Sequence, residues 1–270
     1  IHCTHRTEET DMPYADNDGT RIHYHVEGNG PPLILQHGFT SSLKNWYAHG
    51  YVEPLKAAYQ LILIDARGHG ESDKPHDPAE YDLKLRVNDV VSVLDALGID
   101  KAHYLGYSMG GRIGFGIAIH APERVNSLII GGMHPYDTGG NASPSDRVKL
   151  LGQGMEAYVV NTEAQSGSIE PQRRARLLAN DPQALIAAIS APRGTSGDVL
   201  PTMKMPCLLY VGEADGFFEG AREAAKHIPG AEFASFPGLD HGQVSQGSDV
   251  VLPHVIEFLQ HVTEQVPTAD

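Results

Sequence analysis

The sequence of 270 residues is poor in cysteine and has no long apolar run. Its two cysteines, Cys3 and Cys207, cannot form the several disulfides that hold small secreted domains together, so we expect a reducing, cytoplasmic location. No stretch approaches the roughly 18 apolar residues of a membrane-spanning helix. Residues 1–10 are polar and unlike a secretory signal, so we expect no signal peptide in this sequence.

Basic residues are also few. The sequence has 20 lysines and arginines against 34 aspartates and glutamates, which gives a formal net charge of −14 at pH 7. A surface this negative repels phosphate backbones and anionic lipid headgroups. We therefore expect neither a nucleic-acid partner nor a membrane partner, and we look for a small-molecule ligand. The length and the 41% of hydrophobic residues predict one domain with a well-buried core.

Short apolar runs alternate with helix-like stretches along most of the chain. This alternation predicts an α/β fold in which helices cover both faces of a mostly parallel sheet. Residues 13–26 alternate around Asn17-Asp18-Gly19, a turn signal that predicts an antiparallel hairpin at one edge of the sheet. Buried strands are predicted at residues 32–36, 61–64, 102–105, 127–130, 207–211 and 232–236.

Apolar residues keep helical spacing at residues 82–97, where Gly98 supplies a stop, and again at residues 250–262. Residues 134–202 interrupt this rhythm, because they contain no convincing strand. We predict that they form a small helical lid inserted into a core made of residues 13–133 and 203–265. The helix-like stretches of the lid are residues 147–160, 171–178 and 182–189.

Residues 106–110, Gly-Tyr-Ser-Met-Gly, follow one expected strand and precede a helix-compatible stretch at residues 111–120. A serine on a tight strand-to-helix turn has a strained backbone that lifts its hydroxyl clear of the sheet, and the flanking glycines let neighbouring elements approach. The turn also presents backbone N–H groups at a helix N-terminus, where they stabilise developing negative charge. This pattern makes Ser108 a candidate nucleophile.

A serine nucleophile needs a base, and the base needs an acid that orients it. Asp215 and His241 each lie just past an expected strand, in the order that this chemistry requires. Glu213 and Asp240 are alternatives for the acid. Glu213 lies nearer its strand, and Asp240 is the neighbour of His241, which is a poor geometry for bonding its ring. We therefore predict a catalytic triad of Ser108, Asp215 and His241.

Residues 36–40, Gln-His-Gly-Phe-Thr, come directly after the first buried strand. Backbone N–H groups of such a loop, together with the N–H after the nucleophile, hold the oxyanion formed in acyl transfer. We assign this role to the backbones of Phe39 and Met109. Because the donors are main-chain groups, the two side chains remain available to shape the pocket.

Four segments together resemble the α/β-hydrolase superfamily, namely residues 35–39, 65–73, 106–111 and 238–241. The resemblance spans about residues 14–262. It implies an eight-stranded, mostly parallel sheet with a lid between the sixth and seventh strands. The resemblance is to the branch of small esterases, lactonases, carbon–carbon bond hydrolases and cofactor-free perhydrolases. Relatives that act on epoxides or haloalkanes carry Asp at the elbow, so Ser108 argues against both. In this family residues 65–73 are chiefly structural.

The sequence has no complete motif for binding a metal or a cofactor. His23 and His25 are placed to share one face of a strand, but no third ligand is obviously partnered with them. Gly28-Asn29-Gly30 is followed by two prolines, which cannot open a phosphate-binding helix. We expect no metal and no cofactor.

The lid sequence has an apolar inner face, and this predicts a pocket for an uncharged, fairly small ester or lactone that is cleaved through an acyl-enzyme intermediate. One alternative is a carbon–carbon bond hydrolase of a vinylogous diketone, which needs a polar or basic pocket residue such as Arg112. Another is a ligand sensor that keeps the triad but turns over poorly. The pocket residues that we predict are Met133, Tyr158, Phe217 and Phe218.

Overall fold

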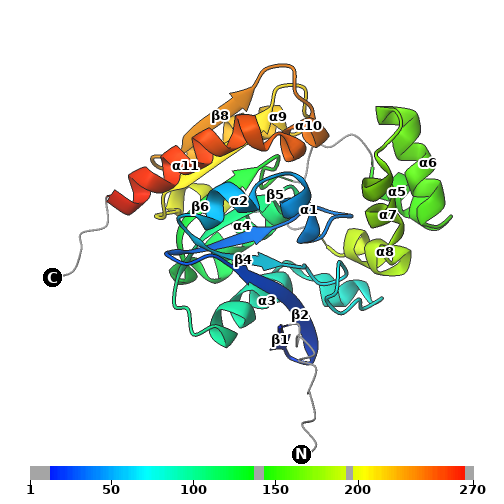
Figure 1. Ribbon diagram of the computed structural model, residues 1–270, viewed down its shortest axis with the longest axis horizontal. Helices are drawn as coiled ribbons and strands as arrows, with labels where there is room; N and C mark the ends of the chain where they lie inside the picture. The colour runs from blue at the N-terminus through cyan, green and yellow to red at the C-terminus, as the bar shows by residue number, and fades with distance from the viewer. Residues whose placement is uncertain (1–12, 137–142, 193–196, 265–270) are drawn as a thin grey trace, which may run out of the picture.

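A computed structural model describes residues 13–136, 143–192 and 197–264 (Figure 1). Residues 137–142 and 193–196 of the expected lid, and residue 265 of the expected core, lie outside the described residues. The strands of the structure are β1 (Tyr14–Asn17), β2 (Thr20–Glu27), β3 (Pro32–Gln36), β4 (Gln60–Ile64), β5 (Ala102–Tyr107), β6 (Val125–Gly131), β7 (Cys207–Gly212) and β8 (Glu232–Phe236).

These strands form one eight-stranded sheet in the order β1-β2-β4-β3-β5-β6-β7-β8. β1 and β2 form the antiparallel hairpin expected around the Asn17-Asp18-Gly19 turn, and β2 is antiparallel to β4. All other neighbours are parallel. The predicted α/β fold with a mostly parallel sheet is confirmed, and the carboxyl ends of its parallel strands meet along one edge.

The two faces of the sheet bury different residues, because side chains alternate along a strand. Ile34 of β3 packs in the core on one face, whereas Leu33 and Leu35 pack in the core on the other. Helices α3 (Leu83–Ala96), α4 (Met109–His120) and α9 (Phe218–His227) contribute to the first core. The second core receives residues from α1 (Lys44–Ala48), α2 (Val52–Lys56), α10 (His241–Gln246) and α11 (Ser248–Glu264).

Four helices between β6 and β7 stand as a group to one side of the sheet (Figure 1). The sequence predicts one helix over residues 147–160, but the structure has two, because the chain turns at Gly152 and Gly154, where Gly154 has a φ of 94°. We call these four helices the helical excursion. They are α5 (Pro144–Leu151), α6 (Met155–Ser166), α7 (Pro171–Leu178) and α8 (Pro182–Ser190).

Short 3-10 turns complete the described chain at Pro78–Tyr81, Pro122–Arg124 and Gly197–Thr202. Among the residues that the structure describes, no helix is both long enough and apolar enough to cross a membrane.

Candidate active site

Ser108 lies at the junction between β5 and α4, with φ 55° and ψ −110°. It is one of only three non-glycine residues with positive φ in the described ranges. The turn is tight: a Cβ on Gly110 would lie 2.1 Å from the carbonyl oxygen of Gln36, and a Cβ on Gly106 would lie 2.4 Å from that of Gly110. Glycine is therefore required on both sides, and the strained turn raises the serine above the sheet edge.

His241 and Asp215 are in direct contact. The Nδ1 atom of His241 lies 2.6 Å from Oδ2 of Asp215. The other carboxylate oxygen of Asp215 accepts a hydrogen bond of 3.0 Å from the backbone N–H of Phe217. The Asp215 side chain is 1% exposed, whereas that of His241 is 30% exposed. A buried carboxylate therefore fixes one ring nitrogen of a histidine whose other side reaches solvent.

Tyr107 also holds His241 in place. Its hydroxyl donates a hydrogen bond of 2.6 Å to the carbonyl oxygen of His241, and the two rings lie 5.1 Å apart. The ring of Phe217 lies 5.5 Å from that of His241 on another side. The histidine is thus packed between two aromatic residues, one of which is adjacent to Ser108.

The two alternative acids are engaged elsewhere. Glu213 accepts a hydrogen bond of 2.9 Å from the hydroxyl of Ser235 at the surface. Asp240 caps α10, where its side chain accepts the backbone N–H of Gln243 at 2.8 Å. Of the three carboxylates considered from the sequence, Asp215 is the one that contacts the ring of His241.

The loop after β3 packs against the turn that carries Ser108. A Cβ on Gly38 would lie 3.3 Å from the Cβ of Ser108. Thr40 in this loop has a φ of 60°, a strained conformation for a threonine. In the described part of the chain, the backbone N–H groups of Phe39 and Met109 donate no hydrogen bond. Both predicted oxyanion donors are therefore free, and Met109 opens helix α4, where such N–H groups lack intrahelical partners.

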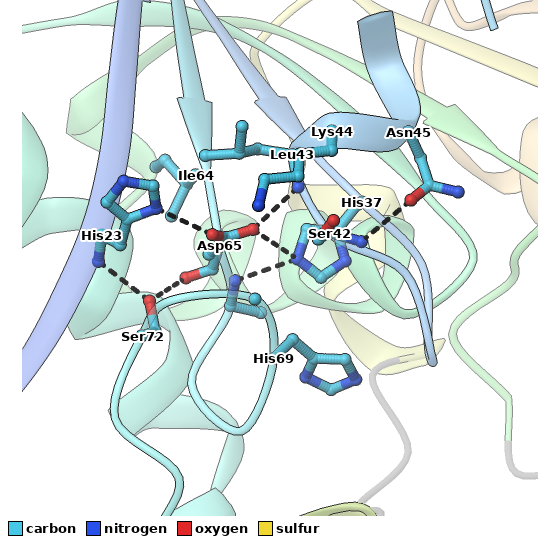
Figure 2. Close-up of polar contacts among 12 residues, drawn as sticks. His23, His37, Ser42, Leu43, Lys44, Asn45, Ile64, Asp65, His69 and Ser72 are labelled. Carbon is cyan, nitrogen blue, oxygen red and sulfur yellow. Dashed lines mark hydrogen bonds and ion pairs between the residues drawn. The ribbon is translucent and has the colours of Figure 1, made fainter. Parts of the chain in front are cut away.

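Asp65, directly after β4, anchors the same loop from beneath (Figure 2). One carboxylate oxygen accepts the backbone N–H of Leu43 at 2.8 Å, and the other lies 2.8 Å from Nδ1 of His23. Nε2 of His37 accepts the backbone N–H of Ala66 at 3.1 Å. These bonds tie both ends of the loop, residues 37 and 43, to the end of β4.

Hydrogen bonds and burial determine the ionisation states of Asp65 and His37. Burial opposes ionisation of Asp65, but the hydrogen bond from His23 and those from the backbone N–H groups of Glu71 and Leu43 lower the pKa of its carboxyl group. Burial lowers the pKa of His37, so its ring stays neutral and its Nε2 remains an acceptor. The expectation that residues 65–73 are structural agrees with these contacts.

Ser108 and His241 open on a common cleft of about 170 Å³. Asn180, just past α7, ties the excursion to this site, because its Nδ2 donates to the carbonyl oxygen of Thr40 at 3.1 Å. The cleft combines polar and apolar side chains and includes two arginines from α7. Its lining residues are Gly38, Phe39, Thr40, Ser41, Asn45, His49, Tyr107, Ser108, Arg173, Arg176, Leu177, His241, Gly242, Ser245 and Gln246.

The four pocket residues predicted from the sequence are not among these lining residues. Met133 is buried in the core beside α4, and Tyr158 packs within the helical excursion. The ring of Phe218 lies 6.4 Å from that of Phe233, and the ring of Phe217 lies 5.5 Å from that of His241. The excursion packs most of its apolar side chains in clusters of its own and against Phe39, while Leu177 lines the cleft.

Arg112 is likewise not among the lining residues. The cationic side chains of the cleft are instead Arg173 and Arg176, which sequence reasoning missed. Their spacing of three on a predicted helix placed them on one face. The sequence contained no signal that this face turns toward Ser108.

The His23-x-His25 pair has another use. Nδ1 of His23 bonds Asp65, and the two rings lie 5.0 Å apart. Within residues 13–136, 143–192 and 197–264, no group of three histidine, cysteine or acidic residues is arranged to hold a metal ion.

Comparison with known proteins gives one family and several full-length likenesses. Residues 31–181 match the family described as alpha/beta hydrolase fold. The sequence is 29% identical, over an alignment of 300 positions, to cis-3-alkyl-4-alkyloxetan-2-one decarboxylase of Shewanella oneidensis, covering 95% of this chain and 92% of that protein.

Two solved structures extend this likeness. The crystal structure of a hydrolase from Pseudomonas aeruginosa PA01 has a TM-score of 0.81 and 26% identity, and the match covers 93% of this chain and 99% of that one. Est816, described as an N-acyl homoserine lactone degrading enzyme, has a TM-score of 0.74 and 28% identity over 91% of this chain and 100% of its own.

Proposed function

The chain belongs to the alpha/beta hydrolase fold family, and from this premise we propose that it is a serine hydrolase that cleaves a small carboxylic ester or lactone through an acyl-enzyme intermediate. One observation carries the proposal: the His241 ring, fixed by Asp215 at 2.6 Å, opens on the same cleft as the strained Ser108. Two relatives support a lactone by their names, since an oxetan-2-one is a four-membered lactone and Est816 degrades a homoserine lactone.

The first half of the proposed reaction forms the acyl-enzyme. Ser108 Oγ attacks the substrate carbonyl carbon while Nε2 of His241 takes the hydroxyl proton. The carbonyl oxygen becomes an oxyanion, which the backbone N–H groups of Phe39 and Met109 stabilise. When the tetrahedral intermediate collapses, the bond to the alkoxy oxygen breaks and His241 returns the proton to that oxygen. With a lactone, the released hydroxyl stays attached to the acyl group.

The second half releases the acid. His241 takes a proton from a water molecule, whose oxygen attacks the acyl carbon, and then gives the proton to Ser108 Oγ as the ester bond to the serine breaks. Asp215 keeps the His241 ring in the required tautomer and stabilises its protonated form. The approach of His241 to Ser108 belongs to this cycle, because such contacts commonly tighten only when substrate is bound.

A substrate panel tests the proposed function. We expect purified protein to hydrolyse 4-nitrophenyl acetate, 4-nitrophenyl butyrate or simple lactones, with a burst of nitrophenol equal to the enzyme concentration where deacylation limits the rate. A dienoate-type ketone in the same panel represents the carbon–carbon bond hydrolases. Turnover of the ketone alone would replace the ester with a carbon–carbon bond as the target, and binding without any turnover would indicate a ligand sensor.

Asp65 is proposed to position the loop at residues 37–43, which carries the Phe39 backbone donor and is called the oxyanion loop here. In Asp65→Asn, one acceptor is replaced by an amide N–H that faces the donors of Leu43, Glu71 or His23. We expect unfolding free energy to fall by about 1–3 kcal/mol and kcat for an ester to fall more than KM rises. Urea unfolding and steady-state kinetics measure the two effects.

The control for this variant is Asp73→Asn in the same segment. Asp73 pairs at 3.1 Å with the side chain of Arg21, which is 62% exposed, and its other oxygen accepts the backbone N–H of Arg21 at 2.8 Å. Removal of an exposed pair costs at most about 1 kcal/mol, so kcat should be unchanged. Unchanged kcat in a folded Asp65→Asn protein would contradict the positioning role.

A further inference from the structure

The charge of the cleft is opposite to that of the protein. The whole sequence has a net charge of −14, yet the residues that line the cleft include Arg173 and Arg176 and no aspartate or glutamate. Two positively charged side chains in the candidate active site of an otherwise acidic protein attract anions to that site.

The arginines of α7 divide into two groups. Arg174 points away from the cleft and forms ion pairs with Glu156 and, at 3.8 Å, with Glu163. Arg173 and Arg176 are three residues apart, so they share the face that lines the cleft. Within the described ranges neither of them forms a salt bridge.

The nearest candidate partner on the same helix is already used. The carboxylate of Glu170 caps α7 and accepts the backbone N–H groups of Gln172 and Arg173 at 2.9 and 3.0 Å. Nε of Arg176 is buried and, in the part of the chain that the structure describes, has no hydrogen-bond partner. A buried guanidinium donor without an acceptor is costly, and an anion entering the cleft would supply the acceptor.

His49 completes this side of the cleft. Burial lowers the pKa of His49 to about 4, and the charges of Arg176 and Arg173 contribute to the shift. The ring is therefore neutral near pH 7 and does not add a third positive charge. Arg173 and Arg176 form no ion pair within the described ranges, while the pKa of the nearby Glu170 carboxyl is lowered by its bonds to the backbone of Gln172 and Arg173 and by the charge of Arg176. An anion placed between the two guanidinium groups relieves their mutual repulsion.

From these observations we propose that the cleft selects esters or lactones that carry a carboxylate, which Arg173 and Arg176 bind while Ser108 attacks the carbonyl group. This inference rests on the proposed hydrolase function. A guanidinium group binds the two oxygens of a carboxylate with parallel hydrogen bonds. The cleft volume of about 170 Å³ is below the roughly 300–1,000 Å³ of ordinary ligand pockets, so the carboxylate and the carbonyl belong to one short molecule.

A matched pair of esters tests the selectivity. Mono-4-nitrophenyl adipate carries a free carboxylate, and its primary amide has nearly the same shape without the charge. We expect wild-type protein to prefer the carboxylate ester by at least about tenfold in kcat/KM, because charge-assisted hydrogen bonds are the stronger ones. Arg173→Gln and Arg176→Gln should each remove about tenfold of this preference, mainly through KM, since the carboxylate is held equally in ground and transition states.

Two control variants separate charge from general damage. Arg174→Gln changes the same helix but leaves the cleft cations in place, so the preference should stay unchanged. Arg176→Lys retains the charge without the planar fork and should recover part of the preference. Turnover of the uncharged amide ester should be unchanged in Arg174→Gln, and in the Arg173 and Arg176 variants the readout is the ratio of the two kcat/KM values for the charged and uncharged esters.

Binding of a dicarboxylate can be measured without turnover. Adipate should bind to Ser108→Ala protein in isothermal titration, and Arg173→Gln or Arg176→Gln added to it should weaken binding by about tenfold. Inorganic phosphate at equal ionic strength should bind more weakly than adipate; tighter phosphate binding would replace the carboxylate with a phosphate.

The outcomes distinguish the two proposals. If neither ester is hydrolysed, the proposed hydrolase function is wrong. The adipate titration alone then tests whether Arg173 and Arg176 bind a carboxylate. If both esters are hydrolysed with equal kcat/KM, or if the arginine variants slow both esters alike, the carboxylate inference is overturned while the hydrolase function stands.

Discussion

Replacement of Ser108 by alanine should reduce kcat for ester hydrolysis by on the order of 10⁴- to 10⁶-fold, the range that loss of a serine nucleophile causes in hydrolases of this chemistry. The substitution removes only the hydroxyl oxygen. Alanine retains the Cβ and the backbone of residue 108, so the turn between β5 and α4 should persist and the oxyanion donors should stay in place. The loss is therefore expected in kcat, with KM little changed.

Covalent labelling provides a second measurement of the same prediction. A fluorophosphonate probe should add one phosphonyl group to the wild-type protein, and peptide mass spectrometry should locate it on Ser108. Ser235→Ala is the matched control, because Ser235 lies at the surface and bonds Glu213. The control should keep its activity and its labelling. Activity of Ser108→Ala within tenfold of wild type, or a label on another serine, would contradict the nucleophile assignment.

Asp215→Asn is expected to lower kcat by about 10⁴-fold while the fold is retained. The carboxylate of Asp215 accepts the Nδ1 proton of His241 at 2.6 Å and the backbone N–H of Phe217 at 3.0 Å. An asparagine keeps the shape, but its amide group turned toward His241 favours the wrong tautomer, in which Nε2 carries the proton and cannot act as base. Stopped-flow or steady-state kinetics with a nitrophenyl ester measure the loss.

The two alternative acids, Glu213 and Asp240, serve as controls for Asp215→Asn. Glu213→Gln changes a residue whose bond is to Ser235, and Asp240→Asn replaces one good helix cap by another. Both variants should stay within a fewfold change of the wild-type kcat. A loss in either one as large as that of Asp215→Asn would show that the acid has been assigned to the wrong residue.

Much of the fold was predictable because its strands are buried on both faces. Continuous apolar runs such as residues 207–211 leave few alternatives to a parallel strand, and the structure has β7 at that place. The same argument located the candidate site. In a parallel sheet the residues just past the strands lie along one edge, so Asp215 and His241 were expected near Ser108 from their order alone.

The rest depended on packing that a sequence pattern does not contain. Helices α1 and α2 have five residues each, too few for an apolar period to be recognised. Tyr158 looked like a pocket residue because it is apolar and lies in the lid sequence, but the excursion has cores of its own that bury such side chains. The direction in which α7 faces is decided by contacts among distant segments, and it brings Arg173, Arg176 and Leu177 to the cleft.

The cleft is lined by loops of the core and by one helix of the excursion, and this has a consequence for evolution and for engineering. The residues proposed for bond cleavage follow core strands, whereas the two cations come from one short helix that is bonded to the core loop through Asn180 and Thr40. Substitutions on α7 would therefore change substrate preference while leaving the chemical step intact. A library randomised at positions 173, 176 and 177, with Asn180 kept, should therefore yield variants with new substrate preferences and an unchanged set of proposed catalytic residues.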